Sequence, residues 1–242
     1  MVWLPAPHGT AAPAVVEPPL LTYYDDRTGE RTELSATDLG GWAARAAGLL
    51  HESCGLGAGS RAAVLLPPHW LTAAALLGAW SIGVEVSFQL WATAGLPPVG
   101  LGAGGPFDVS FVAQERVGSW LEEIPEATHR FVLGEAEGYR SLEPALLEHS
   151  SSLPPYARVR RTDAASVDGT TYGEWGSLAQ ALASEIGLRP GDRLLIDAAE
   201  HEHPVKWLLA PLSTGATVVL CANLDRSLLD GRVAEESVTR VL

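Results

Sequence analysis

The chain has 242 residues, of which 47% are hydrophobic, and a formal net charge of −13. This length fits one large α/β domain or two small ones, and the apolar fraction excludes a disordered chain. The acidic balance argues against nucleic acid as a partner, because binding to phosphate backbones requires clustered Lys and Arg.

The N-terminal residues 1–19 are rich in Pro and Ala but contain neither a basic segment nor an unbroken apolar run. This composition predicts a flexible leader and not a signal peptide. Every apolar stretch is too short or too interrupted to span a bilayer. Cys54 and Cys221 lie far apart and outside any CxxC spacing, which suits a reducing compartment. We therefore expect a cytoplasmic protein without a membrane partner.

The first structured segments predict a hairpin followed by a strand–helix–strand unit. Residues 20–35 contain two Thr- and Tyr-bearing runs around the turn DDRTGE, which favours a hairpin. Apolar periodicity and turn residues then predict, in order, a helix at 38–54, a strand at 61–67, a helix at 70–83 and a strand at 84–88. A unit of this length demands parallel strands and a right-handed crossover.

The middle of the chain carries weaker signals. Residues 90–106 are rich in Gly and Pro and predict a surface loop, within which GLGAGG at 100–105 only loosely resembles a dinucleotide-binding GxGxxG. Alternation and periodicity predict the next elements: a strand at 107–113, a helix at 116–124, a strand at 129–134 and a helix at 141–150.

The same order of elements then returns. GLGAGSR begins at Gly55 and GLRPGDR at Gly187, an offset of 187 − 55 = 132, and with that offset ten of the 32 positions in 55–86 are identical in 187–218. Unrelated segments would share about two. The repeat predicts a helix at 171–187, a strand at 193–198, a helix at 204–215 and a strand at 216–221, followed by a tail at 232–242 that forms a helix and an edge strand.

These patterns predict an α/β fold with two βαβ-containing pseudo-repeats, at about 36–88 and 172–221, in a layered α/β sandwich. The most specific pieces are YYDDRTGER, LLPPHW and WLLAPLSTGATVVLC. With them, most of the chain from about Leu20 resembles the opening part of AMP-binding, adenylate-forming enzymes such as acyl-CoA synthetases. The resemblance is closer still to a family of short actinobacterial proteins of unknown function. It implies a single truncated AMP-binding-like domain over 20–242.

The resemblance implies a Gly/Ser/Thr-rich phosphate loop with a lysine just before the second repeat's helix, and the residues there are VDGTTYGEWGS. Gly169, Thr170 and Thr171 match the loop's Gly-Thr-Thr core. Asp168 stands where a serine is expected and Tyr172 where a glycine is expected, and the next lysine is Lys206. The residues leave three interpretations open: a helix start, a vestigial phosphate loop, or a working phosphate loop.

The helix interpretation rests on capping. Thr171 and Glu174 have the T-x-x-E spacing of a capping box. In the helix that follows, Trp175, Leu178, Ala181, Leu182 and Ile186 are spaced to form an apolar face toward the core.

His201 and His203, in EHEH, are weak metal-ligand candidates, because they are expected in a loop and lack the HExxH pattern. They follow a strand's carboxyl end, where open α/β sheets bind ligands. By the repeat, His201 corresponds to His69, and a histidine in that place is typical of a helix N-terminus.

Two functions of different classes remain. The first is a non-catalytic, degenerate acyl-CoA synthetase-like domain that serves as a binding or interaction module, with no cofactor and no metal. The alternative is an ATP-dependent carboxylate-activating enzyme, which would use ATP or AMP with Mg²⁺ and need a partner chain for the parts that the resemblance implies and this sequence lacks. Exposed sheet edges favour a homodimer or a protein partner in either case.

Overall fold

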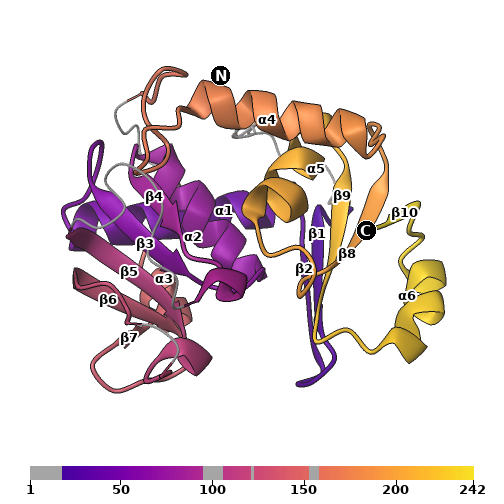
Figure 1. The fold of residues 1–242 in the computed structure, drawn as a ribbon, viewed down its shortest axis with the longest axis horizontal. Helices are drawn as coiled ribbons and strands as arrows, with labels where there is room; N and C mark the ends of the chain where they lie inside the picture. Colours follow the sequence, from indigo (N-terminus) through magenta and orange to yellow (C-terminus); the bar gives the residue numbers. More distant parts are fainter. Residues whose placement is uncertain (1–17, 95–105, 121–122, 153–157) are drawn as a thin grey trace. The chain divides into compact units, whose positions relative to one another are not determined.

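The computed structural model describes residues 18–94, 106–120, 123–152 and 158–242. The chain divides into two compact units, with unit 1 formed by residues 1–40 and 178–242 and unit 2 by residues 41–177. The chain passes between the units within the helices α1 (Ala36–Gly48) and α4 (Tyr172–Glu185). Each unit contains one five-stranded sheet (Figure 1).

Unit 1 contains a mixed sheet in the order β10-β8-β9-β1-β2. Its antiparallel pair is the predicted hairpin, and the other pairs are parallel. The strands are β1 (Leu21–Asp25), β2 (Glu30–Leu34), β8 (Arg193–Asp197), β9 (Thr217–Ala222) and β10 (Arg240–Val241). The short helix α6 (Leu229–Glu235) covers one face, where Leu229 and Val233 pack on a buried cluster that includes Tyr24 and Val219.

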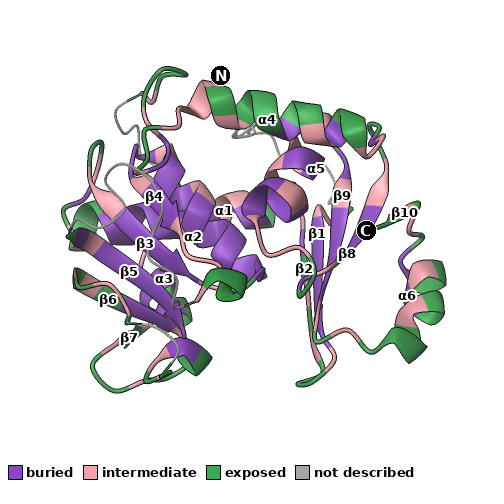
Figure 2. Cartoon of the chain, in the orientation of Figure 1, coloured by how far each residue is buried: buried purple, intermediate pink, exposed green. Residues whose placement is uncertain are grey.

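Unit 2 contains a wholly parallel sheet in the order β4-β3-β5-β6-β7. The strands are β3 (Arg61–Leu65), β4 (Glu85–Phe88), β5 (Phe107–Ala113), β6 (Ala127–Leu133) and β7 (Arg140–Ser141). Between β3 and β4 lies α2 (Trp70–Ser81), which is buried along almost its whole length, and after β7 follows α3 (Leu142–Leu147) (Figure 2). Buried parallel strands explain the continuous apolar runs in the sequence.

The pseudo-repeat is reproduced in the pairing register. Arg61 of β3 lies opposite Glu85 of β4, and Arg193 of β8 lies opposite Thr217 of β9. Both differences, 193 − 61 and 217 − 85, equal the sequence offset of 132. The prediction of two βαβ-containing halves is therefore confirmed.

Three predicted helices differ from the structure. Over its described residues, the stretch 116–124 forms no α-helix; a 3₁₀ turn, Gln114–Arg116, leads into Gly118, whose φ of 75° is incompatible with continuing a right-handed helix. The helix predicted at 204–215 is split into a π-helical turn, Val205–Leu209, and α5 (Ala210–Thr214), because Pro211 has no N–H to donate within the helix. The helix predicted at 141–150 is shorter and ends at Leu147.

The predicted apolar face of α4 is also wrong in part. Leu178 is 49% exposed and Ala181 is exposed, whereas Ala179 and Ala183 are fully buried. The buried stripe is therefore rotated by one to two residues and is lined by small side chains. Small residues let a helix lie close to its neighbour, which a leucine at the same place would prevent.

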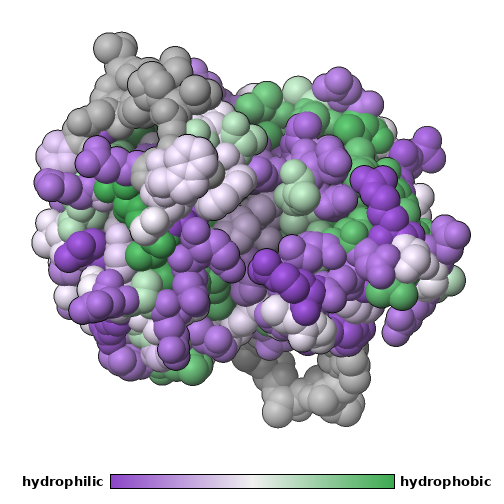
Figure 3. Space-filling view, turned by 60° about the horizontal axis from the view of Figure 1, so that its bottom comes forward, coloured by the Kyte–Doolittle hydropathy of each residue, from purple (hydrophilic) through white to green (hydrophobic). Residues whose placement is uncertain are grey.

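Some predictions fall outside the described residues: the leader over 1–17, most of the loop at 90–106, and GLGAGG. Cys54 and Cys221 are both free, and Cys221 is fully buried. Among the described residues, the helices are all too short or too polar to cross a membrane. Figure 3 shows hydrophilic residues over most of one face with smaller hydrophobic patches between them, as expected of so acidic a chain.

The described part of unit 1 contains buried charge that the sequence did not suggest. Arg232 of α6 donates to Asp26 over 2.6 Å, with both side chains more than nine-tenths buried, and its guanidinium lies 4.1 Å from the centre of the Tyr24 ring. The hydrogen bond from Arg232 holds the pKa of Asp26 below its usual range.

Glu236, directly after α6, is another buried acid. It accepts hydrogen bonds from the Tyr24 hydroxyl, from Arg31 and from Arg193. Burial by itself would raise the pKa of Glu236, but these donors together outweigh it and lower the pKa. The C-terminal segment is thus fixed to the sheet by matched charges.

We expect Arg232→Met to destabilise the protein by about 3–5 kcal/mol, because the variant leaves the Asp26 carboxylate buried without its partner. The double variant Asp26→Asn/Arg232→Met removes both charges and recovers much of that loss. Urea unfolding followed by circular dichroism measures both. Equal stabilities of the single variant and the wild type would show that the pair contributes nothing.

Opposite effects are expected from two helical glycines. A Cβ at Gly78 of α2 would lie 2.5 Å from the Ala46 Cβ and 2.7 Å from the Ala43 carbonyl oxygen, so Gly78→Ala should cost about 1–3 kcal/mol through overpacking. Gly176 of α4 has open space around the same position, so Gly176→Ala should stabilise by about 0.5–1 kcal/mol. Thermal unfolding of the two variants decides, and a stabilising Gly78→Ala would contradict the close contact of α1 and α2.

Candidate functional site

The predicted phosphate-loop residues lie at the tip of a small hairpin in unit 2. Ser166 forms a parallel bridge with Val86 of β4, and Ala164 forms an antiparallel bridge with Thr171. The Val86 amide donates to the Ala165 carbonyl over 3.0 Å, and the Val167 amide donates back to Val86 over 3.3 Å. The hairpin therefore extends the sheet beyond β4.

Three aromatic side chains hold this hairpin, and the sequence analysis missed their role. The indole of Trp80 in α2 donates to the Ala165 carbonyl over 3.1 Å, and that of Trp175 donates to the Ser166 hydroxyl over 2.7 Å. The Tyr172 hydroxyl donates to the Trp80 carbonyl over 2.9 Å, and burial raises its pKa. A bulky tyrosine where the resemblance expects glycine was the signal available in the sequence.

The tip itself is closed by local hydrogen bonds. Gly169 has a φ of 89°, in the region that favours glycine, and its amide donates to the Ser166 carbonyl over 2.9 Å. The Thr170 amide donates to the Asp168 carboxylate over 3.0 Å, which is an Asx turn. Asp168 is therefore occupied in shaping the turn.

The capping box predicted for α4 is confirmed. The Thr171 amide donates to the Glu174 carboxylate over 2.8 Å, and the Glu174 amide donates to the Thr171 hydroxyl oxygen over 3.2 Å. The backbone hydrogen bond from Thr171 lowers the pKa of Glu174, so this side chain is a carboxylate at neutral pH.

The remaining backbone amides at the start of α4 also donate hydrogen bonds within the protein. Tyr172 donates to the Asp163 carbonyl over 3.1 Å, Gly173 to the Arg161 carbonyl over 2.8 Å, and Trp175 to the Thr171 carbonyl over 3.0 Å. Every backbone N–H from residue 169 to residue 175 therefore has an intramolecular acceptor. Gly169, Thr170 and Thr171 lie together at one tip, but their N–H groups already donate to acceptors within the protein.

His201 and His203 lie after β8 in unit 1. His203 Nδ1 accepts a 3.3 Å hydrogen bond from the Val205 amide, as His69 Nδ1 accepts one of 3.0 Å from Leu71 at the start of α2. His203, rather than His201, therefore repeats the role of His69, and His69 is the N-cap of α2 as expected for a histidine at a helix N-terminus.

The environment of the two histidines keeps them neutral. Burial, and then the nearby Lys206, lower the pKa of both side chains. His201 Nδ1 is buried without a hydrogen-bond partner among the described residues. The described part of the chain brings no group of three or more His, Cys, Asp or Glu close enough to hold a metal ion. The expectation that the chain binds no metal, with this pair as weak candidates only, stays a prediction.

No family model matches the chain. A curated protein of Mycobacterium tuberculosis, described as "TIGR03089 family protein", is 34% identical over 240 residues, which cover 93% of this chain and 91% of that protein.

Solved structures of adenylate-forming enzymes share the fold. The Brucella canis acyl-CoA synthetase has a TM-score of 0.71 at 20% identity, covering 93% of this chain and 44% of the synthetase. Mycobacterium smegmatis MbtA has a TM-score of 0.69 at 22% identity, with 93% and 45% covered. The N-terminal domain of FACL13 from M. tuberculosis has a TM-score of 0.67 at 19% identity, with 92% and 58% covered. The chain thus spans less than half the length of the whole enzymes, and its two parallel-rich sheets match their N-terminal domains.

The capping box makes a prediction at the tip. We expect Thr171→Ala to destabilise the protein by about 1 kcal/mol, the usual cost of losing an N-cap hydroxyl. The neighbouring Thr170→Ala is the matched control, and its side chain makes no hydrogen bond within the described residues, so it should change stability little. Chemical unfolding compares the two; similar losses in both would mean that the cap is not formed in solution.

Proposed function

The chain belongs to the TIGR03089 family, and we propose that it is a non-catalytic member of the adenylate-forming fold: an acyl-CoA synthetase-like, AMP-binding-like domain that serves as a binding or interaction module. The observation that carries the proposal is the closed set of backbone hydrogen bonds over residues 169–175.

A phosphate loop works by presenting free N–H groups to an anion, close to small residues. In this chain the amides that would be presented donate instead to Ser166, to Asp163 and to Arg161, and to the cap of α4. Binding a triphosphate at this place would first require the hairpin to break from β4 and the helix to lose its cap. This preorganisation is the opposite of what phosphoryl chemistry needs.

Charge supports the same conclusion. Asp168 and Glu174 flank the tip, and the single lysine of the chain, Lys206, belongs to unit 1 and not to this loop. Two like charges about 4 Å apart repel by about 1 kcal/mol in water and by about 4 kcal/mol at an effective dielectric constant of 20. The exposed Arg160 and Arg161, in the preceding segment, offset part of this negative charge, but they replace none of the N–H groups engaged at the tip.

The alternative is a ligase that activates a carboxylate with ATP–Mg²⁺ and a partner chain. The residue types Gly169, Thr170 and Thr171 and the shared fold favour it, and the proposal above requires that they no longer hold nucleotide. A cytoplasmic location and a homodimer or protein partner remain predictions under either function.

The two functions are separated by nucleotide titration. We expect millimolar ATP–Mg²⁺ to leave the thermal unfolding temperature unchanged, whereas a ligand at 100 times its dissociation constant would add about 2.7 kcal/mol of stability. The double variant Asp168→Ser/Glu174→Gln removes the negative charges but keeps the hairpin amides engaged, so it should also fail to bind. Hydrogen exchange over residues 161–175 reports directly whether the hairpin opens.

The proposal fails if ATP–Mg²⁺ stabilises the wild type and the effect is lost in Thr170→Ala. It also fails if the protein releases pyrophosphate from ATP in the presence of a carboxylic acid. Stabilisation in the double variant alone would show that charge, and not the hydrogen-bonded tip, is the barrier.

A further inference from the structure

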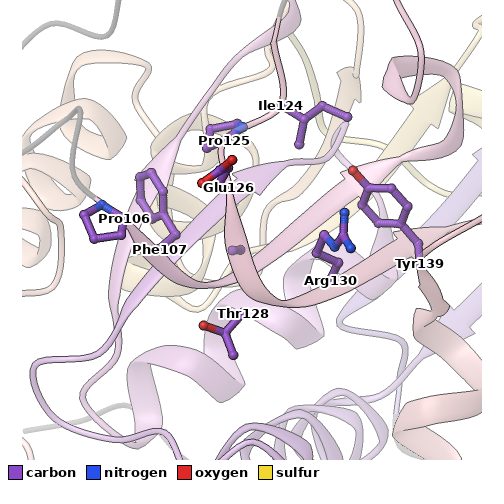
Figure 4. Close-up of a pocket in the computed structure, with 9 residues that line it drawn as sticks. Pro106, Phe107, Ile124, Pro125, Glu126, Thr128, Arg130 and Tyr139 are labelled. Carbon is purple, nitrogen blue, oxygen red and sulfur yellow. The ribbon is translucent and has the colours of Figure 1, made fainter.

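A pocket of about 450 Å³ opens at the amino ends of β5 and β6 in unit 2 (Figure 4). Its size lies in the range of small-molecule sites, roughly 300–1,000 Å³. It shares no residue with the 163–175 hairpin, so what it binds is independent of whether the chain handles nucleotides.

The pocket has a rigid apolar wall. Phe107 is only 4% exposed and belongs to a buried cluster with Ala63, Leu65 and Val112. Ile124 and Tyr139 are partly buried and pack against the same cluster. Phe107 therefore supports the wall from within the sheet's core, and the surface open to a ligand comes from Ile124 and Tyr139.

One guanidinium, that of Arg130, lines the same pocket. Arg130 of β6 is an exposed lining residue, and its guanidinium lies 5.5 Å from the centre of the Tyr139 ring. The close-up shows the two side chains next to each other (Figure 4). Stacking on an aromatic face orients the guanidinium and leaves the N–H groups at its edge available to an acceptor.

Arg130 has no ion-pair or hydrogen-bond partner within the described residues. The side chains of Arg158, Arg160, Arg161 and Arg189 have none there either, but Arg130 differs from them in lining the pocket. Nearby Arg140 pairs with Glu148 over 2.5 Å, and Arg61 donates to the Pro106 carbonyl. Glu126 lines the same pocket, but it forms no salt bridge with Arg130. The guanidinium thus retains its full capacity for an anionic ligand.

We propose that this pocket binds a small organic carboxylate with an aromatic body, with the carboxylate on Arg130 and the ring against Ile124 and Tyr139. A planar carboxylate matches the forked geometry of a guanidinium, and the apolar wall takes the ring out of water. Glu126 disfavours a dianion, so a monocarboxylate is the preferred class.

The test uses phenylacetate as the probe and the whole chain labelled with ¹⁵N. We expect phenylacetate to shift the amide resonances of residues 107, 124, 126–130 and 139 in a saturable way. The neutral analogue phenylacetamide has the same ring and should bind roughly tenfold more weakly or worse, because charge-assisted hydrogen bonds are about twice as strong as neutral ones. The cation phenethylamine should not compete.

Matched variants locate the charge. Arg130→Gln should reduce the affinity for phenylacetate to that for phenylacetamide. Because Arg130 is exposed, the variant should keep its fold, and its amide spectrum checks this. Arg140→Gln, in the same unit but outside the pocket, should bind as the wild type does. Glu126→Gln should bind equally well or more tightly, because a like charge is removed.

Three results would overturn the proposal: phenylacetate and phenylacetamide binding equally, Arg130→Gln binding phenylacetate like the wild type, or shifts that concentrate elsewhere in the chain. None of these depends on nucleotide binding at the hairpin, so the pocket and the proposed function fail separately.

Discussion

The described structure depends on one pairing constraint, which is that a segment upstream of each repeat's first helix pairs with the last strand of the other repeat. Val218 of β9 pairs with Leu21, which precedes α1, and Val86 of β4 pairs with Ser166, which precedes α4. Val86 and Val218 are themselves related by the offset of 132. Without this exchange, β9 and β4 would each leave an unpaired edge, which proteins rarely tolerate.

The same constraint decides the chemistry of the 168–175 segment. Because Ser166 pairs with Val86 of β4, the chain must turn within a few residues to begin α4. Asp168 and Gly169 make that turn. The helix start then needs acceptors for its first amides, and Thr171, Glu174, Asp163 and Arg161 supply them. The segment resembles a phosphate loop in composition, but its backbone N–H groups are all used in hydrogen bonds within the protein.

Arginine supplies all but one of the basic residues of this acidic chain. Some of its guanidiniums are paired with acids in the fold, and others have no acid partner in the described chain. In unit 1, Arg232 and Arg193 are buried against Asp26 and Glu236, where they hold the C-terminal segment to the sheet. In unit 2, Arg130 stacks on Tyr139 without an acid partner in the described chain. Neutralised guanidiniums stabilise the fold, and Arg130, which has no acid partner within the described residues, is the one that we propose recognises a ligand.

The sequence by itself determined the α/β class, the 132-residue repeat, the hairpin at the start and the capping box of Thr171 and Glu174. These features follow from local periodicity, turn residues and short-range hydrogen bonds, which depend on neighbours along the chain. Only the tertiary structure decided that 116–124 is not an α-helix over its described residues, that Leu178 is exposed, and that the loop amides are all engaged. The acceptors in Asp163 and Arg161, the aromatic contacts of Trp80 and the unpaired charge of Arg130 are set by which strands lie side by side, and no periodicity within a single segment records that.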